Sequence, residues 1–300
     1  MPLNSFEQLY QFADAAPEPV GIAVAGGADS TVLEALRTAR DRGWVLPSVV
    51  GKETEIRALG LDVRGFTLID SADPAPTAVA LVRNGQAKFL MKGQIATPAL
   101  LKAVLDPALG LRTGRIICQV VLMEIGERRF LLADTGICIQ PTLEQKIDIM
   151  TSAMDMARAL GVECPRVAVM AATETVTDSM PETVDAAELQ RRSQAGEFPG
   201  CTVRGPLSFD LAYDAAAAVK KKLADPDHAI ADIMLFPNLL VANLTVKAIM
   251  YTADSRFGGI LCGAACPVVF MSRADTTATR LNSLALALKI RDFQGAKGNE

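Results

Sequence analysis

Histidine is almost absent from this chain of 300 residues, which contains only His228, one tryptophan and three tyrosines. A Ser-His-Asp hydrolase, a histidine-ligated metal enzyme or a histidine general base would each have to depend on that single side chain. His228 stands in the stretch DPDH, which is typical of a solvent-exposed turn. Any chemistry is therefore expected to use serine, arginine, lysine, carboxylates or backbone amides.

The chain also lacks a basic excess and a long apolar run. It has 30 Lys and Arg against 34 Asp and Glu, and this net charge of −4 argues against a nucleic-acid-binding protein. The longest apolar stretch, residues 258–271, is rich in glycine and contains Pro267, so it is too short and too broken to cross a membrane. The N-terminus MPLNSFEQLY shows no secretory signal.

Cysteine is sparse and scattered, which argues against a disulfide framework. The six cysteines are spread along the chain in a way that is typical of reduced thiols in a cytoplasmic protein. Cys262 and Cys266 form a loose pair, but no second pair accompanies them and His228 is distant in sequence. We therefore expect no metal site.

Short apolar runs alternate with segments of helical period along the chain. Residues 20–24, 87–91, 166–170, 230–236 and 267–271 are predicted as buried strands because they are short, rich in branched residues and bounded by turn signals. Such alternation predicts an α/β fold with mainly parallel strands flanked by helices. The length of the chain favours two domains or one large α/β domain.

Two other segments have clear local signatures. Residues 143–160 are predicted as an amphipathic helix that begins at a capping box of Thr142 and Gln145 and stops at Gly161. Residues 115–134 contain two strand-like runs around GER, which predicts a β-hairpin. The polar segment 173–200 is expected to carry a helix.

The stretch PVVFMSRADTT, residues 267–277, contains the first candidate site. Ser272 and Arg273 directly follow a predicted strand, and a helix is predicted to begin near Thr276. Ligands of open α/β sheets bind beyond the carboxyl ends of strands, where free helix N–H groups attract anions and an arginine can grip phosphate with two hydrogen bonds. Arg273 could equally form a surface ion pair. Asp275 is either the N-cap of the helix or a catalytic carboxylate.

A second cluster lies at FLMKGQIATPALL, residues 89–101. Lys92 and Gly93 follow a predicted strand, and Thr97 is expected to cap a helix whose first turn holds Pro98. A cation beside a helix N-terminus is suited to clamp a phosphate or a carboxylate. By contrast, Arg112 and Arg115 in GLRTGR lie on either side of a glycine turn, a position that is more typical of solvated arginines.

Two further segments carry weaker signals of a site. Asn238 and Asn243 lie after a predicted strand and around a helix start. The stretch AVAGGADSTVLEAL, residues 23–36, has two glycines between a strand and a helix. It is not G-x-G-x-x-G and lacks the Lys-Ser/Thr of a P-loop, so it is weak support for a nucleotide site.

Six blocks of the chain together resemble the phosphate acetyltransferase and phosphate butyryltransferase family, and the butyryl branch more closely. In family order they are LMKGQIATPALLKAVLD, GLRTGR, LADTGICIQPTLEQKIDI, GCTVRGPLSFDLA, ADIMLFPNLLVANLTVKAI and CPVVFMSRADTTATRLNSLALAL. They run from Leu90 to Leu288, so the similarity covers most of the chain.

The resemblance implies a two-domain α/β fold related to isocitrate and isopropylmalate dehydrogenases, with the active site in the cleft between the domains. Residues 1–139 plus 258–300 would form the domain that carries the Ser-Arg motif, and residues 140–257 the other. The implied reaction converts acyl-CoA and phosphate into acyl phosphate and CoA in a ternary complex, with coenzyme A as a substrate. No permanently bound cofactor, metal, nucleic acid or membrane is implied. A cytoplasmic homodimer is expected.

The resemblance also assigns site residues. Ser272 and Arg273 match the family's catalytic Ser-Arg pair, and Asp275 is the nearest carboxylate. The expected substrate-binding residues are Lys92, Gly93, Thr97, Arg112, Gly205, Pro206, Asp210 and Asn243. Of these, Gly205, Pro206 and Asp210 fall in the family's Gly-Pro-Leu segment, and Asn243 matches the asparagine of its Gly-Asn step.

The chain departs from the family pattern at two positions. Ala242 replaces the glycine before Asn243, and Thr279 stands where the acetyl branch has an aspartate that has been proposed as the base. These departures leave open a catalytically inactive relative that senses CoA. A metal- and nicotinamide-dependent hydroxy-acid dehydrogenase of the related fold is the other alternative.

Overall fold

The computed structural model describes residues 3–222, 230–272 and 274–297, so His228 and Arg273 lie outside the described residues. The chain forms two compact units. The N-terminal unit comprises Phe6–Arg115 and Phe257–Glu300, and the central unit comprises Met1–Ser5 and Ile116–Arg256. The division after residue 256 lies next to the expected one. The other division falls after residue 115 instead of residue 139, because the hairpin beyond it pairs with a strand of the central unit.

The N-terminal unit is built on six strands, in the order β3-β2-β1-β4-β11-β10. Neighbouring strands run parallel except for the antiparallel pair β10 and β11. The chain moves outward from β1 to β2 and β3, then returns past β1 to form β4. In chain order its elements are α1 (Phe6–Asp14), β1 (Val20–Ala25), α2 (Ser30–Asp41), β2 (Val45–Gly51), α3 (Glu53–Ala58), β3 (Thr67–Asp70), α4 (Pro74–Arg83), β4 (Phe89–Lys92), α5 (Thr97–Val104), β10 (Ser255–Cys262), β11 (Val268–Val269) and α11 (Thr277–Lys297).

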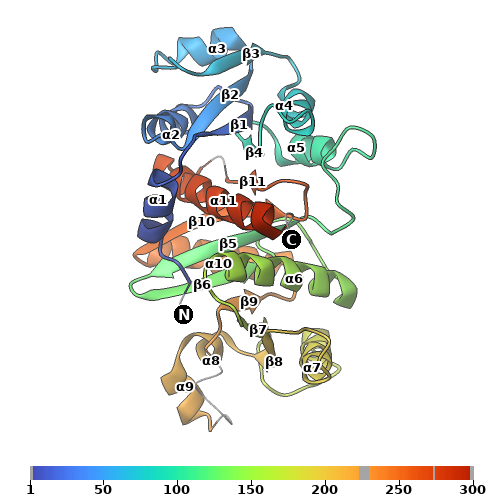
Figure 1. Ribbon diagram of the computed structural model, residues 1–300. Coiled ribbons are helices and arrows are strands. Elements are labelled where there is room, and N and C mark those ends of the chain that lie inside the picture. Colours follow the sequence, from blue (N-terminus) through green and yellow to red (C-terminus); the bar gives the residue numbers. More distant parts are fainter. Residues whose placement is uncertain (1–2, 223–229, 273, 298–300) are drawn as a thin grey trace. The chain divides into compact units, whose positions relative to one another are not determined.

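Branched and aromatic residues fill the core of the N-terminal unit. Ile22 and Val24 of β1 and Phe89 and Met91 of β4 are fully buried. Helices α2 and α4 lie on either side of β1 and β2, and α11 packs against α1 and α2 (Figure 1). This coverage of both faces explains why β1 and β4 are buried along almost their whole length.

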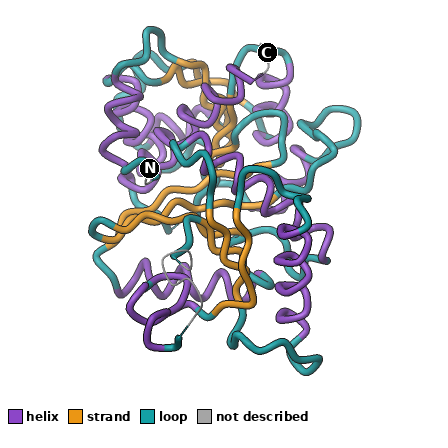
Figure 2. Tube along the Cα trace, turned by 60° about the horizontal axis from the view of Figure 1, so that its bottom comes forward, coloured by secondary structure: helices purple, strands orange, loops and turns teal. Residues whose placement is uncertain are grey.

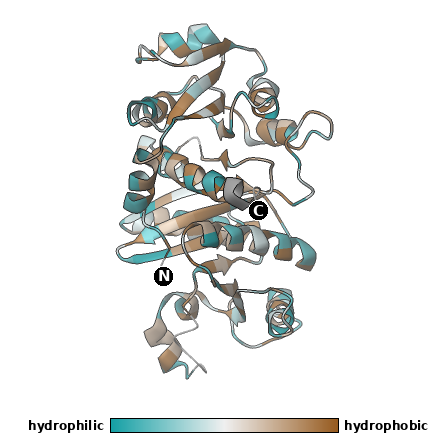
Figure 3. Cartoon of the chain, viewed as in Figure 1, coloured by the Kyte–Doolittle hydropathy of each residue, from teal (hydrophilic) through white to brown (hydrophobic). Residues whose placement is uncertain are grey.

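The central unit has five strands in the order β5-β6-β9-β7-β8. Strands β5 and β6 form an antiparallel hairpin, and the other neighbours run parallel. Figure 2 shows the strands in orange with helices in purple beside them. Helix α7 is mostly hydrophilic in Figure 3. The elements are β5 (Cys118–Ile125), β6 (Arg128–Ala133), α6 (Leu143–Ala159), β7 (Arg166–Met170), α7 (Pro181–Gln194), β8 (Thr202–Leu207), α8 (Phe209–Tyr213), α9 (Ala215–Lys220), β9 (Ile233–Leu235) and α10 (Leu239–Thr252).

Most predicted elements are present. A strand overlaps each of the five predicted runs, the hairpin is confirmed, and α6 begins with the predicted capping box of Thr142 and Gln145. The last predicted strand, residues 267–271, is shorter than expected, since only Val268–Val269 pair as a strand. In the described part of the chain, no helix is both long and apolar enough to cross a membrane.

Candidate functional site

The carboxyl ends of β1, β4 and β11 lie side by side in the N-terminal unit. Ala25 is in register with Lys92, and Met91 with Val269, in parallel ladders. Helices α2, α5 and α11 begin in the segments that follow these strands. The strand order also reverses between β1 and β4, which is where open α/β sheets bind ligands.

Gly93 occupies a position that has no room for a side chain. A Cβ there would lie 2.0 Å from the carbonyl oxygen of Gly26. The next amide, that of Gln94, donates a hydrogen bond of 2.6 Å to the same carbonyl. The turns after β1 and β4 are therefore in direct backbone contact, which gives Gly93 a packing role. Its expected role in substrate binding stays a prediction.

Lys92 is a buried cation at the end of β4. Its side chain belongs to a residue that is 3% exposed, and its Nζ donates to the carbonyl of Gly93 at 3.4 Å. The same Nζ lies 6.0 Å from the ring centroid of Phe270, which directly follows β11. Lys92 thus places positive charge at the junction of the two strand ends.

Ser272 lies in a tight turn between β11 and α11. The exposed Ser272 donates its backbone N–H to Oδ2 of Asp275 at 2.6 Å, and its Oγ accepts the N–H of Ala274 at 3.3 Å. The N–H of Asp275 returns to the carbonyl of Ser272 at 3.2 Å. The turn therefore presents the Ser272 side chain at the surface. Arg273, the other half of the predicted Ser-Arg pair, lies outside the described residues.

The prediction that Asp275 is the N-cap of α11 is wrong. Thr276 takes that role, because its Oγ1 accepts the N–H of Thr279 at 3.2 Å. The carboxylate of Asp275 closes the preceding turn instead. Thr279 is buried, and its hydroxyl lies 3.1 Å from that of Thr276. The alternative role of Asp275 as a catalytic carboxylate stays a prediction.

Thr97 and Arg112 are two further predicted site residues of the N-terminal unit. Thr97 is the first residue of α5 and Ala96 is its N-cap, so the prediction of Thr97 as the cap is wrong by one position. Arg112 is exposed, and its backbone forms an isolated antiparallel bridge to Ala264. This exposure agrees with the solvated role that the sequence favoured.

Arg280 is a residue that the sequence analysis missed. It is 1% exposed, and its Nη2 donates to the carbonyl of Ser272 at 3.4 Å. Burial lowers the pKa of Arg280, while the charges of Asp29 and Asp275 oppose that shift. A signal was available, since Arg280 precedes Leu284 and Leu288 at intervals of four residues and so lies on the apolar stripe of α11.

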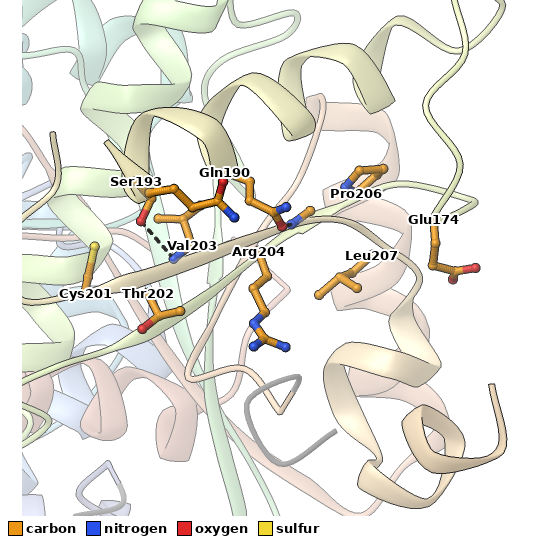
Figure 4. A pocket seen from close by; sticks show the side chains of 11 residues that line it. Glu174, Gln190, Ser193, Cys201, Thr202, Val203, Arg204, Pro206 and Leu207 are labelled. Carbon is orange, nitrogen blue, oxygen red and sulfur yellow. Dashed lines mark hydrogen bonds between the residues drawn. The ribbon is translucent and has the colours of Figure 1, made fainter. Parts of the chain in front are cut away.

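Gly205 and Pro206 belong to β8 of the central unit and line a pocket there. The pocket has a volume of about 580 Å³ and lies between β8 and α7 (Figure 4). Ser193 of α7 accepts the N–H of Val203 at 3.3 Å, and Gln190 accepts that of Gly205 at 3.0 Å. A Cβ on Gly205 would lie 2.8 Å from the Cβ of Val169, so this glycine also has a packing role.

Asp210 lies in the first turn of α8 within an exposed polar network. The hydroxyl of Ser208 lies 2.6 Å from Oδ1 of Asp210 and also contacts the carboxylate of Glu174, so its one proton is donated to one carboxylate or the other. Lys221 Nζ lies 3.1 Å from Asp210 and 3.3 Å from Glu174. The Ser208 hydrogen bond and then Lys221 lower the pKa of Asp210, so this carboxylate is ionised at neutral pH.

Asn243 lies in α10, five residues after the N-cap Asn238, whose side chain accepts the N–H of Val241 at 3.1 Å. The Nδ2 of Asn243 donates to the carbonyl of Thr135 at 3.4 Å. Ala242, which replaces the family's glycine, is fully buried. Its methyl group is therefore accommodated by packing within the unit.

Asp134 organises the loop to which Asn243 is bonded, and the sequence analysis gave it no role. Its buried carboxylate accepts the backbone N–H groups of Gln119, Gly136, Ile137 and Cys138. Burial and the neighbouring Asp134 charge raise the pKa of Cys138 to about 12. Among the residues that the structure describes, no group of three or more His, Cys, Asp or Glu side chains could hold a metal ion.

Comparisons with known proteins agree with the six blocks. Residues 69–288 match the family model described as Phosphate acetyl/butaryl transferase. The chain is 39% identical over 275 residues to the phosphate butyryltransferase of Clostridium acetobutylicum, covering 89% of this chain and 91% of that protein. It is 36% identical over 274 residues to the phosphate acetyltransferase of Thermotoga maritima, covering 89% and 93%.

Solved structures show the same relationship and extend it to a wider fold class. A branched-chain phosphotransacylase from Enterococcus faecalis V583 has a TM-score of 0.81 at 30% identity, covering 91% of this chain and 99% of that one. A 4-hydroxythreonine-4-phosphate dehydrogenase from Klebsiella pneumoniae has a TM-score of 0.52 at 13% identity, with the same coverage, and shares the fold alone. The predicted dehydrogenase-like α/β fold class is confirmed. The chain belongs to the phosphate acetyl/butyryl transferase family and is a phosphate acyltransferase.

Proposed function

We propose that this phosphate acyltransferase interconverts a short-chain acyl-CoA and phosphate with an acyl phosphate and CoA. The observation that supports this most is the edge where β4 and β11 end. There the buried cation Lys92, the exposed Ser272 and the N-terminus of α11 follow adjacent parallel strands. Cations and free helix N–H groups at one edge are suited to bind phosphate oxygens.

The transfer would proceed by direct attack in a ternary complex. The CoA sulfur forms a bond to the acyl carbon, and the bond from that carbon to the phosphate oxygen breaks. The phosphate leaves with the electron pair, and the thiol proton passes to a carboxylate or to solvent. With a cysteine-like thiol pKa of about 8.5, forming the thiolate at pH 7 costs about 2 kcal/mol, which is a small demand. Positioning and charge stabilisation are the greater demands.

The chain's own residues would meet those demands. Ser272 would hydrogen-bond the thioester oxygen or the thiol, Arg273 would hold the phosphate, and Asp275 is the carboxylate proposed to accept the proton. Lys92 would neutralise phosphate charge from the end of β4. The remaining proposed substrate-binding residues are Gly93, Thr97, Arg112, Gly205, Pro206, Asp210 and Asn243. Their location at a site between two domains, the homodimer, the cytoplasmic location and the absence of a bound cofactor stay predictions.

A coupled assay tests the reaction. The purified protein is mixed with CoA and acetyl, propionyl or butyryl phosphate, and thioester absorbance is followed. We expect thioester formation with at least one of the three. No signal with any of them would overturn the proposed reaction.

Isotope exchange tests the ternary complex. Labelled phosphate is incubated with the protein and butyryl phosphate, with and without CoA. Direct attack predicts that label enters butyryl phosphate only when CoA is present. Exchange without CoA would show an acyl-enzyme and contradict direct attack.

A catalytically inactive, CoA-sensing relative is the second candidate. It is favoured by Thr279, whose buried hydroxyl pairs with Thr276 where the acetyl branch has an aspartate. It predicts a preparation that binds CoA in calorimetry but never forms thioester from any of the three acyl phosphates. Turnover in the coupled assay would exclude it.

A further inference from the structure

Arg280 is a buried cation that is bonded to neutral oxygens. Its Nε donates to Thr31 Oγ1 at 2.9 Å, and its Nη2 donates to the carbonyl of Ser272 at 3.4 Å. Its Nη1 is buried and has no hydrogen-bond partner among the described residues. The guanidinium is therefore only partly satisfied inside the unit.

This placement is unfavourable for stability alone. Burying a charged group costs free energy unless it is paired and fully hydrogen-bonded. Arg280 also lies in the first turns of α11, near the positive end of the helix dipole, where a cation is disfavoured. An apolar side chain of similar volume would avoid both costs, so the arginine is expected to serve the neighbouring site.

The bonds of Arg280 connect the Ser272 turn to the start of α2. The carbonyl of Ser272 that it contacts also accepts the N–H of Asp275, which closes the turn. Thr31 in turn donates to the carboxylate of Asp29 at 2.6 Å, and Asp29 caps α2. One guanidinium thus links the turn before α11 to the first residues of another helix.

We propose that Arg280 is a positioning residue, whose guanidinium fixes the Ser272 turn against Thr31 and so sets the orientation of Ser272. The catalytic consequence rests on the proposed function of Ser272, whereas the structural link does not. The charge of Arg280 would also add to the positive potential at the edge where Lys92 lies.

Amide hydrogen exchange tests the link without any enzyme assay. Arg280→Gln removes both bonds, and Thr31→Val removes the acceptor while keeping the arginine. We expect the amides of the Ser272–Thr276 turn to exchange about tenfold faster in both variants, since each loses a hydrogen bond that restrains the turn. Unchanged exchange in this segment would overturn the proposal.

Lys146→Met supplies the matched control. Lys146 is another buried cation, paired with Asp185 at 2.6 Å in the central unit. Its loss is expected to lower Tm but to leave exchange of the Ser272 turn unchanged. Faster exchange of that turn in the control would mean that global destabilisation, and not the Arg280 link, is being measured, which would overturn the proposal.

Steady-state kinetics then test the catalytic consequence. Arg280→Lys keeps the charge, but a single ammonium cannot reproduce the guanidinium's two bonds. We expect both Arg280→Lys and Arg280→Gln to lower kcat by roughly 10–100-fold with the KM for CoA nearly unchanged, because misplaced catalytic groups cost rate more than binding. Only Arg280→Gln should also raise the KM for acyl phosphate.

A double variant completes the design. Thr31→Val combined with Arg280→Gln should be no slower than Arg280→Gln alone, because both changes remove the same interaction. Additive losses, or a kcat per folded protein within about twofold of wild type for Arg280→Gln, would overturn the positioning role. An inactive wild type would instead refute the proposed function, and hydrogen exchange would still decide the Arg280 link.

Discussion

At the scale of single residues, close backbone contact determines what Gly93 tolerates. We expect Gly93→Ala to lower the free energy of unfolding by roughly 1–3 kcal/mol, since its Cβ would lie 2.0 Å from the Gly26 carbonyl and the two turns must separate. Urea denaturation measures the loss. Gly51→Ala is the control, because its nearest atoms are at 3.4 Å or more. Equal losses in the two variants would contradict the packing role.

Arg273 is the residue on which the proposed chemistry depends most. Arg273→Ala is expected to lower kcat/KM by about 10²–10³-fold, the usual effect of removing a donor that stabilises transition-state charge. Arg64→Ala is a suitable comparison, since the Arg64 side chain is 90% exposed and forms a surface salt bridge with Asp62 at 2.9 Å. Similar activity of the two variants would remove Arg273 from the mechanism.

Thiol reactivity is a third residue-scale property. Burial raises the pKa of Cys266 to about 12, whereas Cys164 is exposed. At pH 8, iodoacetamide should label Cys164 first and should label Cys266 only after unfolding, because the thiolate is the reactive form. Peptide mass spectrometry measures both rates. Equal labelling of the native protein would contradict the buried thiol.

Local sequence signals identified some of these residues but not others. Lys92 and Ser272 each stand where an apolar run gives way to polar residues, and this change is visible in the local sequence. Arg280 bonds to Thr31, 249 positions away, and a local pattern carries no information about such a partner. The packing role of Gly93 likewise depends on Gly26 from another strand.

At the scale of elements, α6 shows how a cap contributes to a helix. Thr142 Oγ1 accepts the N–H of Gln145, whose side chain returns to the Thr142 N–H. Thr142→Ala should lower the free energy of unfolding by about 1 kcal/mol, because the N–H of Gln145 at the helix end loses its side-chain acceptor. Urea denaturation measures the change.

Thr151 in the same helix provides the control for that measurement. Its hydroxyl bonds back to the carbonyl of Ile147 inside α6 at 2.8 Å. Thr151→Ala is expected to be neutral or slightly stabilising, since alanine has the higher helix propensity. A larger loss for Thr151→Ala than for Thr142→Ala would contradict the importance of the cap.

Three of the strands that escaped prediction contain residues that weaken a strand pattern. Strand β2 includes Pro47, β8 includes Gly205 and Pro206, and β10 includes a Gly-Gly pair. Their pairing is enforced by neighbouring strands, whose contribution outweighs the local preference. The capping box and the hairpin were predictable because their determinants lie within a few residues.

At the scale of the whole molecule, ionised carboxylates make stability depend on pH. Hydrogen bonds from Arg191 and then Arg192 lower the pKa of Glu188 to about 2, and a hydrogen bond from Arg42 lowers that of Asp14. Such groups bind protons more weakly in the folded state, so their stabilisation is present above the unfolded pKa values near 4 and is lost as pH falls.

Calorimetry at several pH values checks this dependence. Tm is expected to be nearly constant between about pH 8 and 6 and to fall from about pH 5 toward pH 2, because the paired carboxylates become protonated over that interval. Because these ion pairs are exposed to solvent, the expected change in Tm is modest, and added salt should reduce it. A Tm that rises on acidification would contradict the assigned pKa directions.

The α/β class and the family were accessible from the sequence, because strand–helix alternation and six ordered blocks extend along most of the chain. The division of the chain after residue 115 could not be predicted from the sequence. It depends on β6 pairing with β9, which lies about a hundred residues later in the sequence, and not on any linker composition.

The most direct test of the central claim is a crystal structure with CoA and inorganic phosphate bound. We expect phosphate where β11 leads into α11, with oxygens at about 3 Å from the donors of Ser272 and Arg273. Phosphate bound elsewhere, with the Ser272 turn empty and Arg273 directed into solvent, would contradict the proposed site.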